Sequence, residues 1–360
     1  MIVQLYKQPT GLSYLMEIPV TFFLKLENAD TFDINLFPDW FNEVFGTTNN
    51  LENGLYQKFN RLYLKYKSIA DKAQRDLLVK AFTDGIQIEN LCNRISGIEA
   101  KPISGFPEVS NELKSVLMHL WKNSLQYDKF ETLKAKTTVK EYAKNFINTH
   151  HSQICPFCGL EGYLYVAGQS RPALDHWLCK DDFPYSSVNF DNLIPIGDKC
   201  NESPAKGTKN VLSITGGTKV FYPFTEHSGI KVTVSCKKVP TIPDIENGVY
   251  EIEIEPTDSN NQDIFDSWDS LFNIKTNYKS YLEDTLLNSW KLTYKEYIEK
   301  SKKLKPANTV DELINNLEYW QDSFQPNITI GFLVLDAFVE NLLSMPKAYL
   351  YGLCEYFKRS

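Results

Sequence analysis

The sequence predicts an α+β protein in which a small β-rich module lies between mainly α-helical N- and C-terminal regions. Apolar residues recur at spacings of three and four from residue 53 to residue 147, which is the period of an amphipathic helix. After Cys155 the pattern changes to short apolar runs with the length of β-strands, and from Asp263 to the end the helical period returns. We therefore expect a helical region at 1–149, a β-rich module at 150–240 and a mixed, then helical region at 241–360.

The helical period of the first region is carried by four sets of apolar residues. We expect Thr138 to cap the last of these helices, and the proline- and glycine-containing segment 101–107 to interrupt the series. The sets are Leu55, Phe59, Leu62, Tyr63 and Tyr66; Leu77, Leu78 and Phe82; Leu113, Val116, Leu117 and Leu120; and Val139, Tyr142, Phe146 and Ile147.

The β-rich module contains several candidate strands, and Gly216-Gly217 is a candidate hairpin turn. In the last region, alternating apolar and acidic residues predict a half-exposed strand at 249–254, and Pro346 is expected to interrupt the final helices. The strands expected in the module are 163–166, 173–178, 193–196, 211–214, 219–222 and 230–234.

Composition limits the class of protein. A chain of 360 residues with 42% hydrophobic residues can bury two or three cores. The net charge of −7 argues against a protein that coats nucleic acid by bulk electrostatics. Residues 199–238 nevertheless carry seven lysines against two acids, which indicates either a local basic surface or scattered solvated lysines.

No segment resembles a membrane span or a signal peptide. Leu12–Phe23 is interrupted by Glu17 and Pro19, and the apolar run 328–335 is too short to cross a bilayer. Seven cysteines in a chain without a secretion signal favour a reducing compartment. We therefore expect a cytoplasmic protein with no membrane partner.

One segment of about fifty residues concentrates the residues that carry chemistry. It contains Cys155-Pro-Phe-Cys158, Asp175-His176, Asn192-Leu193, Cys200-Asn201 and Lys206-Gly207. This order resembles the HNH endonucleases, the ββα-metal nucleases of bacterial restriction, homing, CRISPR and defence systems. The resemblance covers roughly residues 150–210. It implies a strand that ends in the Asp-His pair, a loop that carries the first asparagine before a second strand, and a helix that presents the last asparagine towards a metal ion.

The resemblance assigns a role to each of four residues. Phosphodiester hydrolysis needs a base that deprotonates water, and a neutral imidazole suits this at cellular pH, so His176 is the expected base. Asp175 and Asn201 would hold Mg²⁺ or Mn²⁺, which stabilises charge in the transition state. Asn192 would tie the loop and orient the imidazole. Because adjacent strand residues point to opposite faces, Asp175 and His176 can share one phosphate only if the strand ends or bulges there.

The cysteines indicate a structural metal site. Cys155 and Cys158 have the spacing of a zinc knuckle, although two buried thiols are the alternative interpretation. The resemblance implies a second cysteine pair, of which Cys200 is present and the first member is replaced by Gly197. The fourth ligand would then be Cys179, His151 or His227, or zinc has been lost. A bound Zn²⁺ would pin the hairpin of the module to the helix that carries Asn201.

The spacing behind Asn201 departs from the family pattern. Four residues separate Asn201 from Lys206, where the family usually has two. Pro204 is tolerated only in the first turn of a helix, so Asn201 should lie close to a helix start. Lys206 and Lys209 are the expected contacts to a nucleic-acid backbone phosphate.

These observations lead to one expected function and two alternatives. We expect a metal-dependent HNH endonuclease of bacterial antiviral defence that cuts DNA to 3′-hydroxyl and 5′-phosphate ends, with helical flanks that recognise substrate or a partner. Paired active sites in a homodimer would cut both strands. The first alternative is a nuclease subunit of an antiphage complex that is silent until a partner such as an ATPase binds. The second is a non-catalytic zinc-knuckle binding module.

Overall fold

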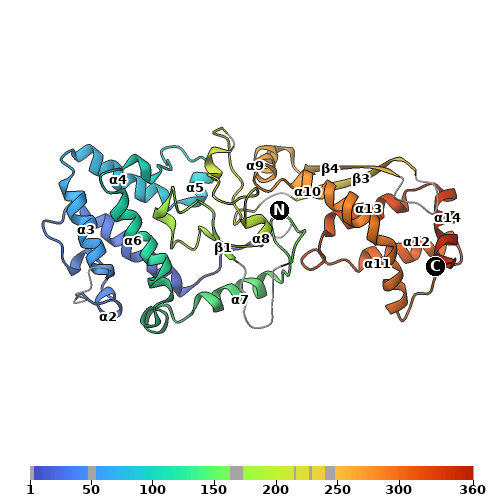
Figure 1. The fold of residues 1–360 in the computed structure, drawn as a ribbon, viewed down its shortest axis with the longest axis horizontal. Helices are drawn as coiled ribbons and strands as arrows, with labels where there is room; N and C mark the ends of the chain where they lie inside the picture. Colours follow the sequence, from blue (N-terminus) through green and yellow to red (C-terminus); the bar gives the residue numbers. More distant parts are fainter. Residues whose placement is uncertain are drawn as a thin grey trace. The chain divides into compact units, whose positions relative to one another are not determined.

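A computed structural model describes residues 4–47, 54–162, 173–214, 216–226, 229–239 and 248–359. It is mostly helical, with two small antiparallel sheets (Figure 1). The chain divides into two compact units, which we describe separately: Leu5–His150 with Leu164–Glu226, called the first unit, and Met1–Gln4 with His151–Tyr163 and His227–Ser360, called the second unit. The strand expected at 163–166 and the candidate ligand His227 lie outside the described residues.

The first unit contains the helices of the N-terminal half, one small sheet and the segment behind it. Its α-helices are α1 (Glu17–Leu26), α2 (Phe41–Val44), α3 (Leu55–Ser68), α4 (Lys72–Gly85), α5 (Ile88–Cys92), α6 (Ser110–Lys122), α7 (Val139–His150) and α8 (Asp198–Asn201), and its strands are β1 (Ala173–His176) and β2 (Leu193–Ile196). Short 3₁₀ or π turns are η1 (Gly11–Met16), η2 (Ile34–Leu36), η3 (Ile103–Gly105), η4 (Ser124–Gln126), η5 (Phe130–Ala135), η6 (Pro184–Ser186) and η7 (Val211–Ser213).

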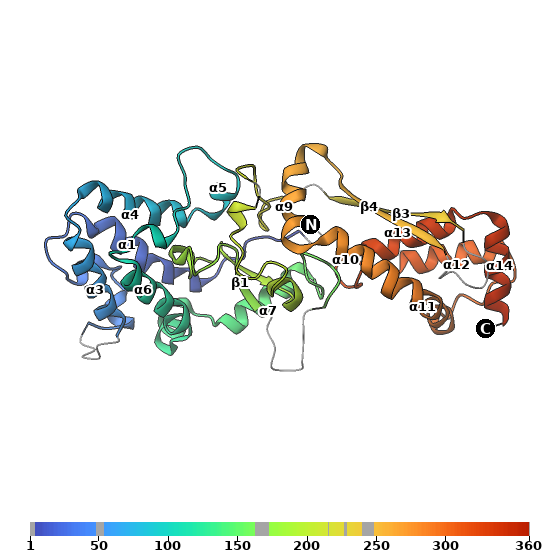
Figure 2. The same ribbon diagram turned by 45° about the horizontal axis from the view of Figure 1, so that its top comes forward.

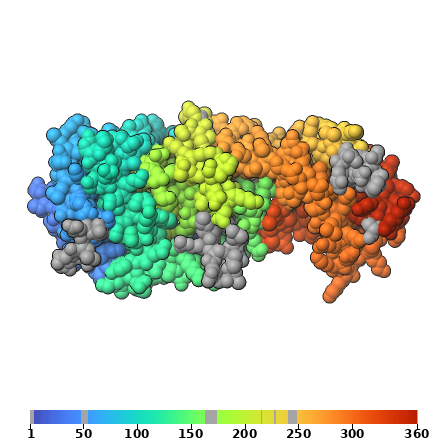
Figure 3. All heavy atoms as spheres, in the orientation of Figure 1, coloured from blue at the N-terminus to red at the C-terminus, as the bar shows by residue number. Residues whose placement is uncertain are grey.

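Aromatic side chains form much of the core of the first unit. The rings of Phe23 on α1 and Phe82 on α4 stack with centroids 4.1 Å apart, and those of Phe37 and Phe41 stack at 4.3 Å. Helix α3 packs against α6. The space-filling view shows the N-terminal part of the chain in blue to teal (Figure 3). Burial of such rings is the main source of stability in this unit, because each removes a large apolar area from water.

The second unit pairs a two-stranded ribbon with a helical bundle. Strands β3 (Ile230–Lys238) and β4 (Val249–Pro256) are antiparallel with Val232 opposite Ile254, and α13 (Phe332–Leu343) packs against β3 (Figure 2). The buried side chains of the ribbon alternate with exposed acidic and basic ones, as the period of a half-exposed strand requires. Its other elements are η9 (Ser259–Asn261), α9 (Gln262–Phe272), α10 (Ile274–Ser280), η10 (Tyr281–Leu286), α11 (Leu287–Lys300), α12 (Val310–Asp322), α13 (Phe332–Leu343) and α14 (Lys347–Arg359).

The expected helices and several strands are confirmed. Thr138 caps α7 reciprocally with Glu141, at 3.1 Å from the Glu141 N–H to Thr138 Oγ1 and 2.8 Å from the Thr138 N–H to the Glu141 carboxylate. Segment 101–107 separates α5 from α6, and Pro346 separates α13 from α14. Strands form at 173–176, 193–196, 230–238 and 249–256.

Two expected strands are wrong. Residues 211–213 form the 3₁₀ turn η7, because the Asn210 side chain accepts a hydrogen bond from the Leu212 N–H at 3.0 Å and starts a turn. Residues 219–222 form no strand, and the Val220 N–H donates instead to the Cys92 carbonyl at 2.9 Å. One local and one long-range hydrogen bond therefore take the place of the expected ladders. Across the described ranges, no helix combines the length and apolarity needed to cross a membrane.

Candidate functional site

Strands β1 and β2 and helix α8 follow one another in the order ββα. The strands pair antiparallel, with Asp175 opposite Ile194 and His176 opposite Leu193. Gly197 follows β2 and leads directly into α8, which ends at Asn201 and packs against β1. The Asp-His pair therefore lies at the end of its strand, and Asn201 lies within one turn of a helix start.

The His176 imidazole is buried and held by a backbone carbonyl. It exposes 5% of its surface, and its Nε2 lies 2.9 Å from the Ser187 carbonyl oxygen. Because a carbonyl only accepts, Nε2 carries the proton and Nδ1 is the unprotonated nitrogen. Ser187 is itself fixed, since its hydroxyl donates to the Leu117 carbonyl of α6 at 3.1 Å.

The surroundings of His176 keep it neutral. Burial, with a smaller contribution from the nearby cations Lys180 and Lys206, lowers the pKa of the imidazole to about 3. The ring of Trp121 on α6 meets it edge to face, with centroids 4.5 Å apart. The ring is thus a neutral base at cellular pH, covered on one side by an indole.

Asn192 ties together the loop that follows β1. It is fully buried; its side-chain oxygen accepts from the Leu178 N–H at 2.7 Å, and its amide donates to the carbonyls of Leu178 at 3.2 Å and Ser186 at 3.3 Å. The Asn192 carbonyl also accepts from the Trp177 N–H at 2.8 Å. These bonds fix the chain on both sides of the Ser187 carbonyl that holds His176. Orientation of the base by Asn192 is therefore indirect, through the loop.

Asp175 makes an ion pair with Lys206. The ammonium lies 2.5 Å from the Asp175 carboxylate and 2.7 Å from the His176 carbonyl oxygen, and the lysine side chain is entirely buried. Burial raises the pKa of the Asp175 carboxyl above its usual value, and Lys206 opposes that rise. The lysine expected to meet a phosphate thus points into the site, whereas Lys209 is exposed.

The local backbone explains why Lys206 points inward. The Lys206 N–H donates to the Cys200 carbonyl at 3.2 Å, so the segment behind α8 turns back toward β1. Gly207 follows with φ +46°, a left-handed conformation that glycine adopts without strain. The longer spacing behind Asn201 therefore forms a turn and does not extend α8.

The Mg²⁺ suggested by the resemblance does not fit the residues as they are arranged. Its expected carboxylate is already paired with an ammonium, and the lysine side chain has no contact with solvent. Mg²⁺ usually keeps several waters and binds one or two carboxylates with near-octahedral geometry. Asn201, the other expected ligand, is half-buried at the end of α8.

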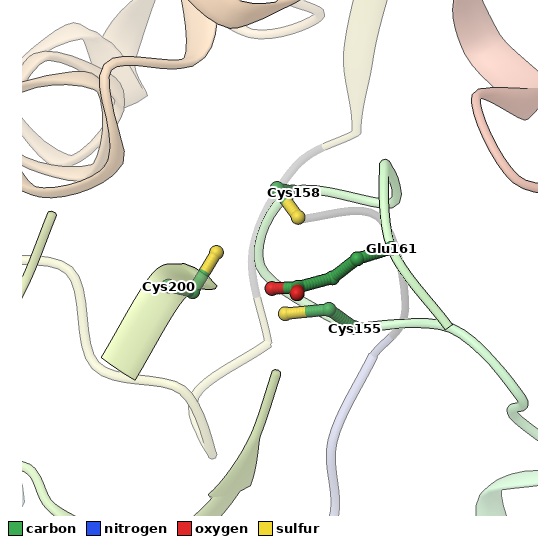
Figure 4. Close-up of side chains that lie close together, drawn as sticks. All are labelled: Cys155, Cys158, Glu161 and Cys200. Carbon is green, nitrogen blue, oxygen red and sulfur yellow. The ribbon is translucent and has the colours of Figure 1, made fainter. Parts of the chain in front are cut away.

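Four side chains gather into a second cluster, which suits a metal. The ligand atoms of Cys155, Cys158, Glu161 and Cys200 all lie within 4.8 Å of one another (Figure 4). The three cysteines are buried, and Glu161 is half-buried. Three thiols and one carboxylate are a donor set that could hold a metal ion. Cys179 and His151 are not members of this cluster.

Backbone hydrogen bonds close a tight turn that carries Cys155, Cys158 and Glu161. The Cys155 N–H donates to the Glu161 carbonyl at 2.8 Å, the Gly159 N–H donates to the Cys155 carbonyl at 2.9 Å, and the Leu160 N–H approaches the Cys158 sulfur at 3.4 Å. Gly159 has φ +66°, which permits the tight turn. N–H groups directed at sulfur favour thiolates. Sequence reasoning restricted to Cys and His missed Glu161, although it lies three residues behind Cys158.

One cavity in the first unit lies apart from these residues. It has a volume of about 520 Å³ and is bordered by the loop after α5 and by η7. Neither the Asp175–Lys206 pair, His176 nor the cysteines line it. We assign it no part in the chemistry of the site.

No family model, curated protein or solved structure matches this chain.

Proposed function

We propose that the chain hydrolyses phosphodiester bonds in DNA as an HNH-type endonuclease. One observation carries the proposal: a neutral histidine at the end of β1, held by a carbonyl on a loop that Asn192 secures, within the order β1, β2, α8. This arrangement leaves one imidazole nitrogen free to accept a proton. The arrangement favours His176 as a base for hydrolysis over a part in redox or nucleophilic catalysis, because no thiol or hydroxyl group among the described residues hydrogen-bonds to its ring.

The proposed step uses Nδ1 of His176. A water oxygen attacks phosphorus while Nδ1 takes one of its protons, and the bond from phosphorus to the 3′ oxygen breaks. Solvent supplies the proton that the departing oxygen gains, and imidazolium later returns its proton to solvent. The pKa of about 3 makes the resting ring a weak base. A phosphodiester beside the ring would raise that pKa, because a negative charge favours imidazolium.

A plasmid assay tests the proposal. Purified full-length protein should convert supercoiled DNA to nicked or linear forms, and His176→Ala should remove this activity. His119→Ala, a half-buried histidine of α6, is the matched control and should retain it. Cleavage at the same rate by His176→Ala would refute the assignment. A parallel RNA substrate decides between the two nucleic acids, and EDTA and Mg²⁺ arms are run for both.

A second candidate function is a nuclease that a partner activates, as in an antiphage complex with an ATPase. The burial of the site favours it, because His176 exposes 5% of its surface and the Trp121 ring covers one side of the imidazole. Inactivity of the chain alone, with activity in the presence of a partner, would support this function. Trp121→Ala should raise the rate of the isolated chain if the indole covers the base. A fall to the His176→Ala level would contradict this role.

We propose that the second cluster binds structural Zn²⁺ with Cys155, Cys158, Cys200 and Glu161 as ligands. Three thiolates suit zinc better than Mg²⁺, and four ligands complete a tetrahedral site without an open position. Mass spectrometry of the native protein should find one zinc per chain. Cys155→Ser should reduce this content strongly, whereas Cys236→Ser, a cysteine outside the cluster, should not. Protein free of zinc when purified in zinc-supplemented medium would disprove the site.

A further inference from the structure

We propose that the Lys206 ammonium takes the place of a divalent cation beside Asp175, so that Asp175 is a counter-ion and not a metal ligand. The inference deepens the proposed function, because it concerns the charge at the same site. It departs from what the HNH resemblance implies. The disagreement arises from contacts within the first unit.

Two contacts fix the ammonium where a cation would be expected. Lys206 Nζ lies 2.5 Å from Asp175 and 2.7 Å from the His176 carbonyl oxygen. Both groups belong to the last two residues of β1, which the pairing with β2 holds in register. The ring of Trp177 lies under the same ammonium, with its centroid 5.8 Å from Nζ. A charge-assisted bond of this length to a mostly buried carboxylate is among the stronger hydrogen bonds in proteins.

Burial makes exchange for a divalent ion unfavourable. The Lys206 side chain has no exposed surface, so displacing its ammonium would leave a buried charge without its partner. Keeping Lys206 in place would put a divalent ion against a like charge in a medium of low polarity. Mg²⁺ would also lose most of its waters, which it gives up reluctantly.

Asp175 lies outside the gathered set of acidic, His and Cys ligands that the described residues contain. Within the described residues, that set of three or more ligand atoms consists of Cys155, Cys158, Glu161 and Cys200, and Asp175 belongs to no other such set. A single carboxylate already neutralised by lysine carries no remaining charge to attract a cation. The site therefore holds one positive charge supplied by the chain itself.

Binding of Mn²⁺ tests this inference without nucleic acid. Free Mn²⁺ is followed by electron paramagnetic resonance while full-length wild type, Asp175→Asn, Lys206→Met and Lys206→Arg are titrated. Wild type, Asp175→Asn and Lys206→Arg should give superimposable curves. Lys206→Met should gain one Mn²⁺ site, because the Asp175 carboxylate is released from its ion pair. The double variant Lys206→Met with Asp175→Asn should lack this added site. The Cys and Glu cluster is common to all variants, so any Mn²⁺ it binds cancels in the comparison.

The outcome is independent of catalysis. A wild-type Mn²⁺ site that weakens tenfold or more in Asp175→Asn would overturn the inference, whatever the nuclease assay shows. If Lys206→Met does not fold, the comparison of wild type with Asp175→Asn still decides the question. In the plasmid assay, cleavage by wild type that persists in EDTA agrees with Lys206 as the cation. Cleavage abolished by EDTA and restored by Mg²⁺ would overturn the inference while leaving the nuclease proposal intact.

Discussion

Replacing Asn192 with alanine should destabilise the first unit by about 3 kcal/mol. The substitution removes three side-chain hydrogen bonds, to the Leu178 N–H and to the carbonyls of Leu178 and Ser186. Each such bond contributes roughly 0.5–1.5 kcal/mol net, and the Leu178 N–H is left without this acceptor in a buried position. The sum lies between about 1.5 and 4.5 kcal/mol, and loss of packing around a fully buried side chain adds to it.

Equilibrium urea unfolding followed by circular dichroism measures this effect. If the free energy of unfolding falls by about 2 kcal/mol per molar urea, the urea concentration at the unfolding midpoint should fall by roughly 1.5 M. If the two units unfold in separate transitions, only that of the first unit should shift, which makes the second unit an internal reference. Asn111→Ala, at an exposed position of α6, is the matched control and should change stability by under about 0.5 kcal/mol. An Asn192→Ala effect as small as the control would refute the loop-tying role.

Three further substitutions test other parts of the structure. The pKa of about 3 in folded His176 lies below the unfolded value of about 6.5, so the unfolded state binds more protons and stability should fall as pH drops from 6.5 toward 3. His176→Gln should flatten the pH dependence of the urea midpoint in that window, by up to about 1.4 kcal/mol per pH unit; an unchanged slope would contradict the buried neutral imidazole. Gly331→Ala should impair folding of the second unit, because φ at this position is +70° and the added Cβ would lie 2.3 Å from the Tyr281 ring. Thermal melting measures this effect, and a melting temperature within 2 °C of wild type would contradict it. Thr138→Ala should cost about 1 kcal/mol through loss of the cap on α7, whereas Thr138→Ser should cost less; equal losses would argue against capping.

The sequence predicted the elements whose signals are local and periodic. The helices α3, α4, α6 and α7 follow from apolar spacing, and Thr138 was identifiable as a cap because its signal lies within four residues. The strands at 211–214 and 219–222 were wrong because their apolar character is satisfied by burial without pairing. Val211 and Val220 are buried, yet backbone N–H groups of their segments donate to the Asn210 side chain and to the Cys92 carbonyl, and these bonds organise the two backbones. Apolar runs of this length predict that the segment is buried, but they do not predict the backbone hydrogen bonds to a neighbouring strand that a β-strand needs.

The candidate site was predictable in its residue types and not in its contacts. Glu161 was missed because a carboxylate has no distinctive spacing in a single sequence, and its place beside the cysteines depends on the turn at Gly159. The direction of Lys206 was missed because lysine is usually solvated, and only the turn closed on the Cys200 carbonyl directs its side chain inward. Both residues acquire their position from backbone conformations that follow the motif.

The Asp175–Lys206 pair permits a sharper test of buried charge, through a double-mutant cycle. The two partners differ in exposure, since the lysine side chain is fully buried whereas 15% of the aspartate side chain is accessible. Asp175→Asn leaves a buried ammonium that has neutral acceptors, such as the His176 carbonyl, but no counter-charge, which should cost about 3–5 kcal/mol. Lys206→Met should cost less, because the released carboxyl can take up a proton, and its pKa is already raised by burial.

The double variant should be more stable than the sum of the two single effects predicts, by about 1–3 kcal/mol, because it leaves no unpaired charge. Urea unfolding of the four proteins at pH 7 measures this coupling. Additive effects within about 0.5 kcal/mol would mean that the two side chains do not share an interaction. A buried pair that couples strongly adds little net stability compared with apolar residues of the same volume. A large coupling energy would therefore distinguish Asp175 and Lys206 from residues that only maintain the fold. It would agree with a fixed positive charge on Lys206 beside the base His176.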